Sequence, residues 1–318
     1  MSIRKYFEFV EIRTSALSLY AYALGAAFIF YYFNHWNWLN SLVFFISEMI
    51  LDNMITAINN VMDYIMAKDE KSKNKSVLVT ENISLPLAFT YITILLLIAA
   101  ALGIWLCLKT NWVLFFAGGL LFLIVLSYTS GPFPISRMPI AEFICGIAQG
   151  MGVPFLFAYI NDNYQKIMTL NFTRLANGEW SFNLNGSLTT VLALIVLCVP
   201  SIFYNSNVML ANNLSDVDED KRNERATLPV VFGRKKAAWL YRFFGYTPFL
   251  FIIIMPFFKM APWLILLTLA TFPKIRKNIE AFIAHPSKAK TFPLALQNYN
   301  LFVGVQALTI FVGALIHF

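Results

Sequence analysis

Residues 39–63, LNSLVFFISEMILDNMITAINNVMD, form an apolar run of helix length that also carries charged and amide side chains. Glu48, Asp52, Asn59 and Asp63 follow one another at intervals of four, seven and four residues. On an α-helix these intervals place all four side chains on one face. Carboxylates that face lipid are costly, so the stripe predicts a membrane helix that lines a polar cavity.

The composition assigns the rest of the chain to the same class. Its 318 residues are 58% hydrophobic and 13% charged, whereas soluble domains are roughly 25% charged. The apolar runs have helix length and lack the alternation of β-barrel strands. We therefore expect an all-α polytopic membrane protein. A net charge of +7 is typical of positive cytoplasmic loops and gives no reason to expect nucleic-acid binding.

Nine apolar segments have the length of a bilayer crossing or approach it. They fall at about 15–33, 39–62, 85–108, 112–127, 139–160, 187–211, 237–257, 261–272 and 294–316. No small-residue cleavage site follows the first segment, so we expect it to be a retained helix. The polar segment 161–186 is expected to be a solvated loop with room for a short surface helix. The pattern predicts about nine transmembrane helices around a central cavity, in a single domain covering residues 1–318.

The basic residues predict the orientation of these segments. If the N-terminus, with Arg4, Lys5 and Arg13, is inside, the outside loops keep four of the 24 Lys and Arg residues. Those four are Lys109, Lys166, Arg174 and Lys259. The bias predicts a multi-pass protein of the cell membrane with a cytoplasmic N-terminus. It also puts the end of the 39–63 run on the cytoplasmic side.

A second polar stretch, residues 212–220 (NNLSDVDED), ends another apolar segment. Asn212, Asp216 and Asp220 recur every four residues and so share one helix face. Basic residues follow both stretches: Lys68, Lys71, Lys73 and Lys75 after the first, and Lys221, Arg222 and Arg225 after the second. Carboxylate oxygens are the ligands that Mg²⁺ prefers, and cations neutralise phosphate oxygens. We therefore expect the two stretches to face each other around Mg²⁺ and a diphosphate.

A third polar stretch lies between these two. Residues 128–134 read YTSGPFP, and Arg137 and Glu142 follow. The Gly-Pro-x-Pro pattern indicates a tight loop between the fourth and fifth apolar segments. Counted from a cytoplasmic N-terminus, that loop lies on the same side as the two acidic stretches.

Together the three stretches resemble the UbiA superfamily of intramembrane aromatic prenyltransferases. The resemblance runs from Arg13 to Gly233. It rests on Asn59-x-x-x-Asp63 followed by Asp69, on the YTSGPFP loop, and on the 212–220 stretch leading into RATLPV at 225–230. The spacing from Asp63 to Asp69, the middle loop and the Thr-Leu-x-Val-x-x-Gly that ends at Gly233 most resemble 1,4-dihydroxy-2-naphthoate polyprenyltransferases of menaquinone synthesis.

The resemblance implies a function and a set of site residues. Mg²⁺, held by Asp63, Asp69, Asp216 and Asp220 with Asn59 and Asn212 beside them, would bind a polyprenyl diphosphate. The phosphate oxygens would meet Lys75 and Arg225, with Lys68 and Arg222 in lesser roles. Tyr128 would lie near the bond that breaks, and Asp52, Arg137 and Glu142 would contact substrate. The catalytic residues would be Asp63, Asp216 and Tyr128, on cytoplasmic active-site loops at about 63–84, 128–138 and 212–236.

Four positions depart from the family pattern. Asn60 stands where Asp is usual, Ser215 where Arg is frequent, Glu224 where Gly is usual, and Asp52 where Gln is frequent. Asn60 removes one carboxylate from the predicted metal site, and Asp52 adds one to the predicted acceptor pocket. These differences leave the diphosphate chemistry in place and bear mainly on the acceptor.

Two alternatives to a naphthoate prenyltransferase remain open. The first keeps the reaction but uses another aromatic ring, or a haem, as acceptor. The second is an ion-coupled transporter, since transporters also carry intramembrane carboxylates. Transporter carboxylates usually lie near the midplane, whereas these clusters lie at helix ends next to basic loops, which favours phosphate binding.

Overall fold

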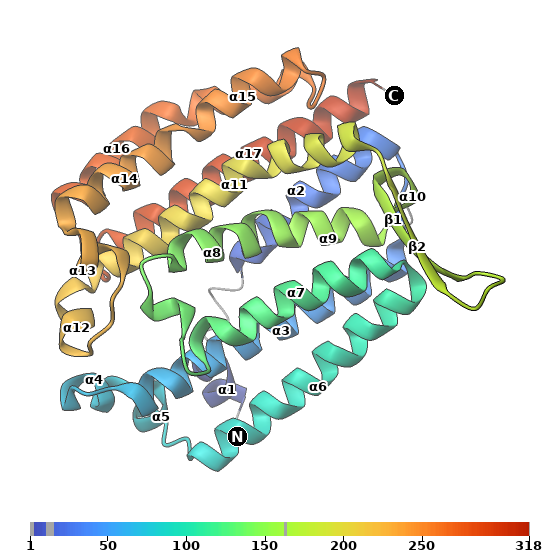
Figure 1. The fold of residues 1–318 in the computed structure, drawn as a ribbon. Helices are drawn as coiled ribbons and strands as arrows, with labels where there is room; N and C mark the ends of the chain where they lie inside the picture. The colour runs from blue at the N-terminus through green and yellow to red at the C-terminus, as the bar shows by residue number, and fades with distance from the viewer. Residues whose placement is uncertain (1–2, 11–15, 162–163, 318) are drawn as a thin grey trace.

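The computed structural model describes residues 3–10, 16–161 and 164–317, which form a bundle of long helices (Figure 1). The helices that run along the bundle are α2 (Ala16–Phe33), α3 (Trp38–Met66), α6 (Leu85–Lys109), α7 (Trp112–Thr129), α8 (Ala141–Ile147), α9 (Val153–Ile160), α11 (Leu188–Ser215), α14 (Arg234–Tyr246), α15 (Pro248–Phe257), α16 (Phe272–Ala284) and α17 (Phe292–His317). A π-helical segment, η2 (Ala148–Gly152), joins α8 to α9. Arg13, where the family resemblance begins, lies outside the described residues.

Shorter elements lie at the ends of the bundle and in its connections. They are α1 (Ile3–Phe9), α4 (Glu70–Lys75), α5 (Val77–Thr80), η1 (Ile135–Arg137), α10 (Tyr164–Ile167), α12 (Val217–Arg222), α13 (Leu228–Phe232) and η3 (Trp263–Thr271). Two strands, β1 (Met168–Arg174) and β2 (Trp180–Gly186), pair in antiparallel fashion. In Figure 1, α4, α5, α12 and α13 gather at one end of the bundle, and the strands lie at the other end.

Local capping explains where several long helices begin. The side chain of Asn37 accepts a hydrogen bond from the backbone N–H of Asn40 at the start of α3. Asn111 caps α7 and Ser187 caps α11 in the same way. Each cap satisfies a backbone donor that the first turn of a helix leaves without a partner. Polar residues between the apolar runs thus set the helix starts.

The expected class is confirmed, but the count of nine crossings is not. Seven helices among the described residues are long and apolar enough to cross a membrane. An eighth apolar helix, the part of α2 over Ser18–Phe33, is shorter. The expected span at 261–272 is instead a 3₁₀ helix of nine residues, η3. Helix η3 runs without a break into α16, so residues 263–284 form one continuous helical segment.

The prediction of a solvated loop at 161–186 is wrong for most of that segment. A short helix, α10, is present, but 168–186 form a β-hairpin whose paired residues run from Met168 opposite Gly186 to Arg174 opposite Trp180. The signal was in the sequence, because apolar and polar residues alternate in MTLNFTR and in WSFNLNG. Alternation of this kind is the signature of a strand, and the many Asn residues obscured it.

Helix α11 lies at the centre of the packing. It contacts α8, η2, α14, α15 and α17, while α3 packs on α6 and α2 packs on α9 and α17. Glycines allow α8 and η2 to approach α11 closely. A Cβ atom at Gly150 would lie 2.5 Å from the backbone nitrogen of Ile202, and one at Gly146 would lie 2.7 Å from the backbone oxygen of the same residue. Small residues at helix contacts are a general way to pack membrane helices.

We expect Gly150→Ala to destabilise the protein by about 1–3 kcal/mol, because the added methyl group would push η2 away from α11. Thermal unfolding in detergent would measure the loss. Gly103→Ala is the matched control, since a Cβ atom at Gly103 meets nothing within 4 Å. Equal unfolding temperatures for the two variants would contradict this account of the contact between η2 and α11.

Candidate active site

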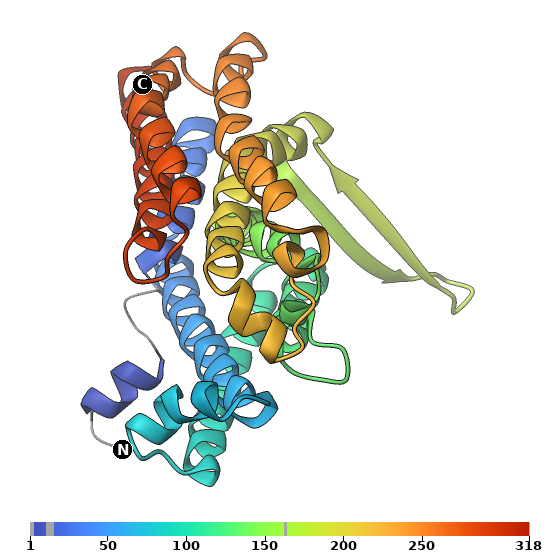
Figure 2. The same ribbon diagram turned by 90° about the vertical axis from the view of Figure 1, so that its left-hand side faces the viewer.

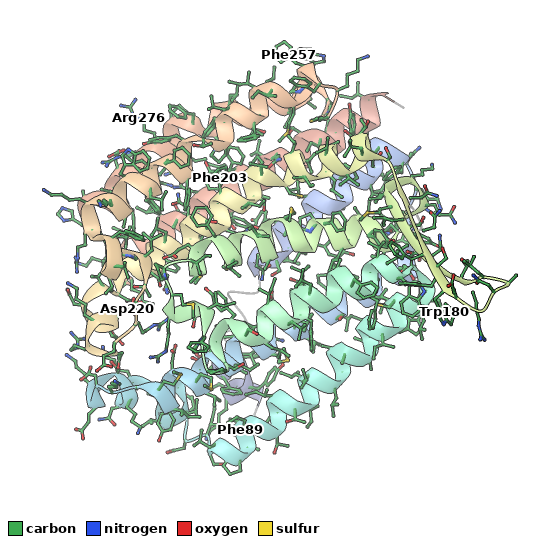
Figure 3. The ribbon with its side chains drawn as sticks, viewed as in Figure 1. Phe89, Trp180, Phe203, Asp220, Phe257 and Arg276 are labelled. Atoms are coloured by element: carbon green, nitrogen blue, oxygen red, sulfur yellow. The ribbon has the colours of Figure 1, made fainter. Side chains whose placement is uncertain are left out.

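The two acidic stretches meet at one end of the bundle. Asp63 lies in the last turn of α3, and Asp216 is the C-cap residue of α11. Asp220 follows in α12, and its label in Figure 3 marks this end, opposite the end marked by Trp180. The stretches are far apart in sequence, so the antiparallel course of the helices between them brings them together.

A polar cavity of about 320 Å³ lies between the stretches. Its lining includes Asn60, Asp63, Ser72, Lys75, Arg137, Asp216, Glu219, Asp220, Asn223, Arg225 and Lys288. Carboxylates and cations from five segments of the chain therefore face one small volume. An arrangement of this kind suits a polyanion that shares its charge between protein cations and a bound metal ion.

Arg225 links the three motifs in this cavity. Its Nη1 atom lies 3.5 Å from Oδ1 of Asp63, and its Nε atom lies 3.4 Å from Oδ1 of Asp220. Its Nη2 atom donates to the backbone oxygen of Ser136, at 3.3 Å, in the loop after the YTSGPFP motif. One guanidinium group thus holds the first acidic stretch, the second acidic stretch and the middle loop at a common point.

The turn that positions Arg225 contains Glu224, which stands where the family usually has Gly. Glu224 has a φ of 51°, in the left-handed region that favours glycine. This conformation lets the backbone N–H of Arg225 donate to the backbone oxygen of Asp220, at 2.9 Å. The Glu224 side chain forms an ion pair with Lys68, so Lys68 is directed to the surface of this loop.

Lys288 is a site residue that the sequence analysis missed. Its Nζ atom lies 2.6 Å from Oδ2 of Asp216, and it lines the polar cavity. It comes from the connection between α16 and α17, far beyond the last motif. The available signal was weak, since Lys288 is one of several basic residues in the predicted inside loops and belongs to no motif.

Asp69 lies outside the cavity lining, although the sequence placed it with the metal ligands. Ser72 donates to its Oδ2 atom at 3.0 Å, and Nε of Arg222 lies 3.5 Å from the same oxygen. The hydrogen bond from Ser72 is the largest cause of a lowered pKa for this exposed carboxyl group. The backbone N–H groups of Lys68 and Asp69 both donate to Oδ1 of Asn223. These contacts fasten the loop after α3 to the loop after α12.

A second cavity, of about 480 Å³, is lined mainly by apolar side chains. Its polar lining groups are Ser47, Glu48, Asp52, Asn59, Tyr128, Cys145 and Gln149. Helix α3 connects the two cavities, because Asn59 lines the apolar one and Asn60 and Asp63 line the polar one. The hydroxyl of Tyr128 is buried and lies beside the thiol of Cys145.

The remaining predicted residues surround the cavities without lining the polar one. Asn59 accepts a hydrogen bond from the hydroxyl of Thr129. Glu142 is fully buried, and its Oε1 atom accepts from Nδ2 of Asn213 at 2.8 Å. Asn212 is absent from the linings of both cavities. The amide that contacts Glu142, after the middle loop, is therefore Asn213, one residue after the predicted Asn212.

The carboxylates fit Mg²⁺ only as part of a shared site. Among the described residues, no group of three or more His, Cys, Asp or Glu side chains is close enough to hold a metal ion. Asp63 and Asp220 are paired with Arg225, and Asp216 is paired with Lys288. Mg²⁺ is commonly bound by one or two carboxylates together with phosphate oxygens. The donor set therefore fits an ion that arrives with a phosphorylated ligand.

Comparison with known proteins gives one family and one curated relative. The UbiA prenyltransferase family matches residues 18–290. A 1,4-dihydroxy-2-naphthoate octaprenyltransferase from Bacillus subtilis (strain 168) is 25% identical over 187 residues, which are 58% of this chain and 52% of the relative. The chain thus matches about half the length of that relative.

Three solved structures have the same fold. A digeranylgeranylglyceryl phosphate synthase has a TM-score of 0.65 at 17% identity, with 99% of each chain covered. A UbiA homologue from Aeropyrum pernix K1 has a TM-score of 0.66 at 18% identity, covering 96% of this chain and 98% of that one. A UbiA homologue from Archaeoglobus fulgidus, bound to GPP and Mg²⁺, has a TM-score of 0.64 at 15% identity, covering 98% and 99%.

We expect Arg225→Met to destabilise the protein, because Asp220, whose side chain is 5% exposed, would lose its cation. Removing one partner of a buried pair costs about 3–5 kcal/mol, and the partial exposure of Arg225 reduces this to about 1–3 kcal/mol. Unfolding in detergent would measure the loss. Arg234→Met is the control, since Arg234 and Asp218 form an exposed pair. Equal losses in the two variants would contradict the role of Arg225.

The stability that Arg225→Met loses should also depend on pH. Burial raises the pKa of Asp220, while Arg225 and Thr227 oppose the rise. The folded state therefore holds this proton more tightly than the unfolded state, so stability falls as pH rises from the usual Asp range through the raised pKa. Without Arg225 the pKa rises further, and we expect a larger fall over a wider pH range. If the free energy of unfolding of Arg225→Met differed from that of the wild type by the same amount at every pH, the predicted pH dependence would be wrong.

Proposed function

The chain belongs to the UbiA prenyltransferase family, and from that premise we propose that it transfers a polyprenyl group from a polyprenyl diphosphate to an aromatic acceptor. The acceptor we propose is 1,4-dihydroxy-2-naphthoate, which gives demethylmenaquinol, the hydroquinone form of demethylmenaquinone. The observation that carries the proposal is the junction of two cavities along α3, one lined by carboxylates and cations and the other by apolar side chains. A prenyl diphosphate has the same division between a charged head and an apolar chain.

The diphosphate would occupy the polar cavity. Lys75, Arg137, Arg225 and Lys288 line it and would contact phosphate oxygens. Binding requires Arg225 and Lys288 to share their charge between the carboxylates and the phosphate oxygens. Lys68 and Arg222 are paired with Glu224 and Asp69 outside the lining, so their role would be to hold the loops.

Asp63, Asp216 and Asp220 would hold Mg²⁺ together with oxygens of the diphosphate. The neighbouring UbiA homologue bound to GPP and Mg²⁺ supports this assignment. The ion would neutralise charge that develops on the diphosphate as the C–O bond breaks. Asp69 would act on this site indirectly, through the loop that carries Lys75.

The apolar cavity would receive the allylic end of the donor and the acceptor ring. When the C–O bond breaks, its electron pair leaves with the diphosphate and an allylic cation remains. The apolar lining excludes water, which would otherwise capture the cation. A ring carbon of the acceptor then forms the new C–C bond, and with the naphthoate the carboxyl group leaves that carbon as CO₂. Tyr128 lines this cavity near its polar end and would face the reacting carbon.

The relative from Bacillus subtilis supports the naphthoate as acceptor, and it matches over about half of its length. Family membership favours a transferase over the ion-coupled transporter that the sequence alone left open. Seven membrane-crossing helices support a multi-pass protein. We propose that residues 1–318 act as one domain in the cell membrane, with the polar cavity on the cytoplasmic side, because most basic residues lie in the loops at that end.

We expect Asp63→Asn and Asp216→Asn each to lower kcat/KM for prenyl transfer by at least about 100-fold, because each removes a carboxylate from the proposed Mg²⁺ site. Membranes with each variant would be assayed for Mg²⁺-dependent diphosphate release and for prenylated product. Asp218→Asn is the control, since Asp218 is exposed and pairs with Arg234 outside the cavity lining. Wild-type turnover in either of the first two variants, at equal protein level, would refute the assignment.

The acceptor itself is tested by mass spectrometry of quinones in cells that lack the protein. Loss of menaquinone and its demethyl precursor, restored by the gene for this chain, is the expected result. Unchanged quinones would exclude the naphthoate. Incubation of membranes with other phenolic rings and with haem, each with a polyprenyl diphosphate, would then identify the acceptor.

A further inference from the structure

Two carboxylates in the apolar cavity have no role in binding a diphosphate. Glu48 and Asp52 lie one turn apart on α3, and both line the cavity of about 480 Å³. Asp52 is 11 residues before Asp63, so about 16 Å of helix separates the pair from the polar cavity. Among the described residues that line this cavity there is no Lys, Arg or His. The pair therefore lies in apolar surroundings without a cation.

Neutral groups hold Asp52 in place. Nε2 of Gln149 donates to its Oδ1 atom at 3.0 Å, and the hydroxyl of Ser18 donates to its Oδ2 atom. Gln149 belongs to the π-helical segment η2, and such segments are frequent at functional sites. Each carboxylate oxygen can accept two hydrogen bonds, so each oxygen of Asp52 retains a position for a further donor. Glu48 is 7% exposed, and the single proton of Ser18 goes to Asp52.

A polyprenyl chain cannot use these carboxylates, because it has no hydrogen-bond donor. An anionic group beside them would be repelled, since two carboxylates in an apolar cavity disfavour further negative charge. A hydroxyl group on an aromatic ring can donate to a carboxylate, and a hydrogen bond to a charged group is among the stronger ones. The chemistry of the pair therefore points to the acceptor and to one end of it.

We propose that Glu48 and Asp52 bind the end of the acceptor ring farthest from the diphosphate, by accepting a hydrogen bond from a ring hydroxyl. The substrate class is a hydroxylated aromatic ring without an anion at that end. This inference rests on the proposed function and adds an orientation to it. An acceptor that has both a carboxylate and hydroxyl groups would place a hydroxyl group at Asp52 and its carboxylate on the side of the ring nearer the polar cavity.

Paired acceptors test this orientation. Wild-type membranes would be compared on 1,4-dihydroxy-2-naphthoate and on its 4-O-methyl ether, which lacks the donor at the far end. We expect the wild type to favour the free hydroxyl by about 10- to 100-fold in kcat/KM. Asp52→Asn and Glu48→Gln should each reduce this preference by about 10-fold while the KM for the polyprenyl diphosphate is unchanged. Ser47→Ala, in the same cavity and on the same helix, is the control and should keep the wild-type preference.

The possible outcomes distinguish a failure of this inference from a failure of the proposed prenyl-transfer function. If the wild type transfers a prenyl group but both acid variants keep its preference for the free hydroxyl, the pair is structural and the inference is wrong. If the wild type transfers nothing to any aromatic acceptor, the proposed function itself is refuted. Because either acid variant alone is informative, misfolding of one, checked by its unfolding temperature, leaves the test intact.

A separate observation concerns the β-hairpin. Its register pairs Leu170 with Leu184 and Phe172 with Phe182 on one face. The intervening pairs, on the other face, are Thr169 with Asn185, Asn171 with Asn183, and Thr173 with Ser181. Because side chains alternate between the faces of a strand, the hairpin has one apolar face and one polar face.

The apolar face of the hairpin is exposed and continues a lipid-facing helix. Trp180 is 72% exposed and Phe182 is 70% exposed. The ring of Phe172 meets the ring of Trp112, the first residue of α7, edge to face at 5.7 Å between centroids. In Figure 2, which looks onto the end with the polar cavity, the hairpin projects sideways beyond the bundle. In Figure 1 it runs across the opposite ends of the helices.

We infer that the hairpin lies in the boundary of the bilayer on the side opposite the polar cavity, with its apolar face in the lipid. A hairpin that runs across the helix ends lies along the membrane surface, and an exposed Trp is typical of that boundary. Its Asn-rich face would meet water and headgroups. The hairpin would thus anchor the non-cytoplasmic end of α7 and α11 against tilting.

Nitroxide labels on neighbouring residues test this placement. Phe182→Cys and Asn183→Cys, made in a chain whose three native cysteines are replaced by Ala, would be labelled and placed in lipid nanodiscs. We expect the label at 182 to be more accessible to oxygen, which dissolves in lipid, and the label at 183 to a water-soluble nickel complex. Equal access of the nickel complex to both, or protection of 182 from both reagents, would overturn the inference.

Discussion

The site depends on neutralising carboxylates at the edge of an apolar bundle, and Arg225 is the group that does most of this. Its guanidinium lies between Asp63 of α3 and Asp220 of α12, and it also donates to the loop after α7. Charges near the membrane boundary are tolerated where they are paired or face a wet cavity. The helix ends are therefore held at the spacing at which one planar cation can serve two carboxylates. Without a ligand, Arg225 neutralises Asp63 and Asp220, and Lys288 neutralises Asp216.

The contacts of Asn60 and of the residues around Ser215 account for two of the departures from the family pattern. Nδ2 of Asn60 donates to the backbone oxygen of Phe9, at 3.0 Å, which a carboxylate could not do. This residue therefore fastens α1 to α3. Ser215 stands where Arg is frequent, and Lys288 provides a cation to the neighbouring Asp216 from a different segment. The charge lost at one position of the motif is thus present in the cavity, carried by a residue outside every motif.

Sequence patterns predicted the all-α membrane class and the meeting of the acidic stretches, because both follow from helix geometry and hydrophobicity. The four-residue spacing correctly selected Asp63, Asp216 and Asp220 for one cavity. It failed where the chain leaves the helix. Asp69 lies in a loop whose path depends on Asn223, and Lys288 lies in another whose path depends on α16 and α17, and no local pattern encodes such contacts. The hairpin differs from the predicted loop for another reason: its polar face is rich in Asn, a residue that is also common in loops.

The two cavities impose opposite requirements on one helix. Near Asp63, α3 needs water-like surroundings in which charge can be neutralised, and near Asp52 it needs an apolar wall. The polar stripe that runs from Glu48 to Asp63 satisfies both only because its ends have different partners. At one end the partner is the guanidinium of Arg225, and at the other it is the amide of Gln149. A carboxyl group held by neutral donors keeps positions at which it can accept a hydrogen bond from a ligand, whereas one paired with a cation is already engaged. The deeper pair is therefore the part of the stripe best able to discriminate between neutral and anionic rings, although it lies farther from the reacting bond.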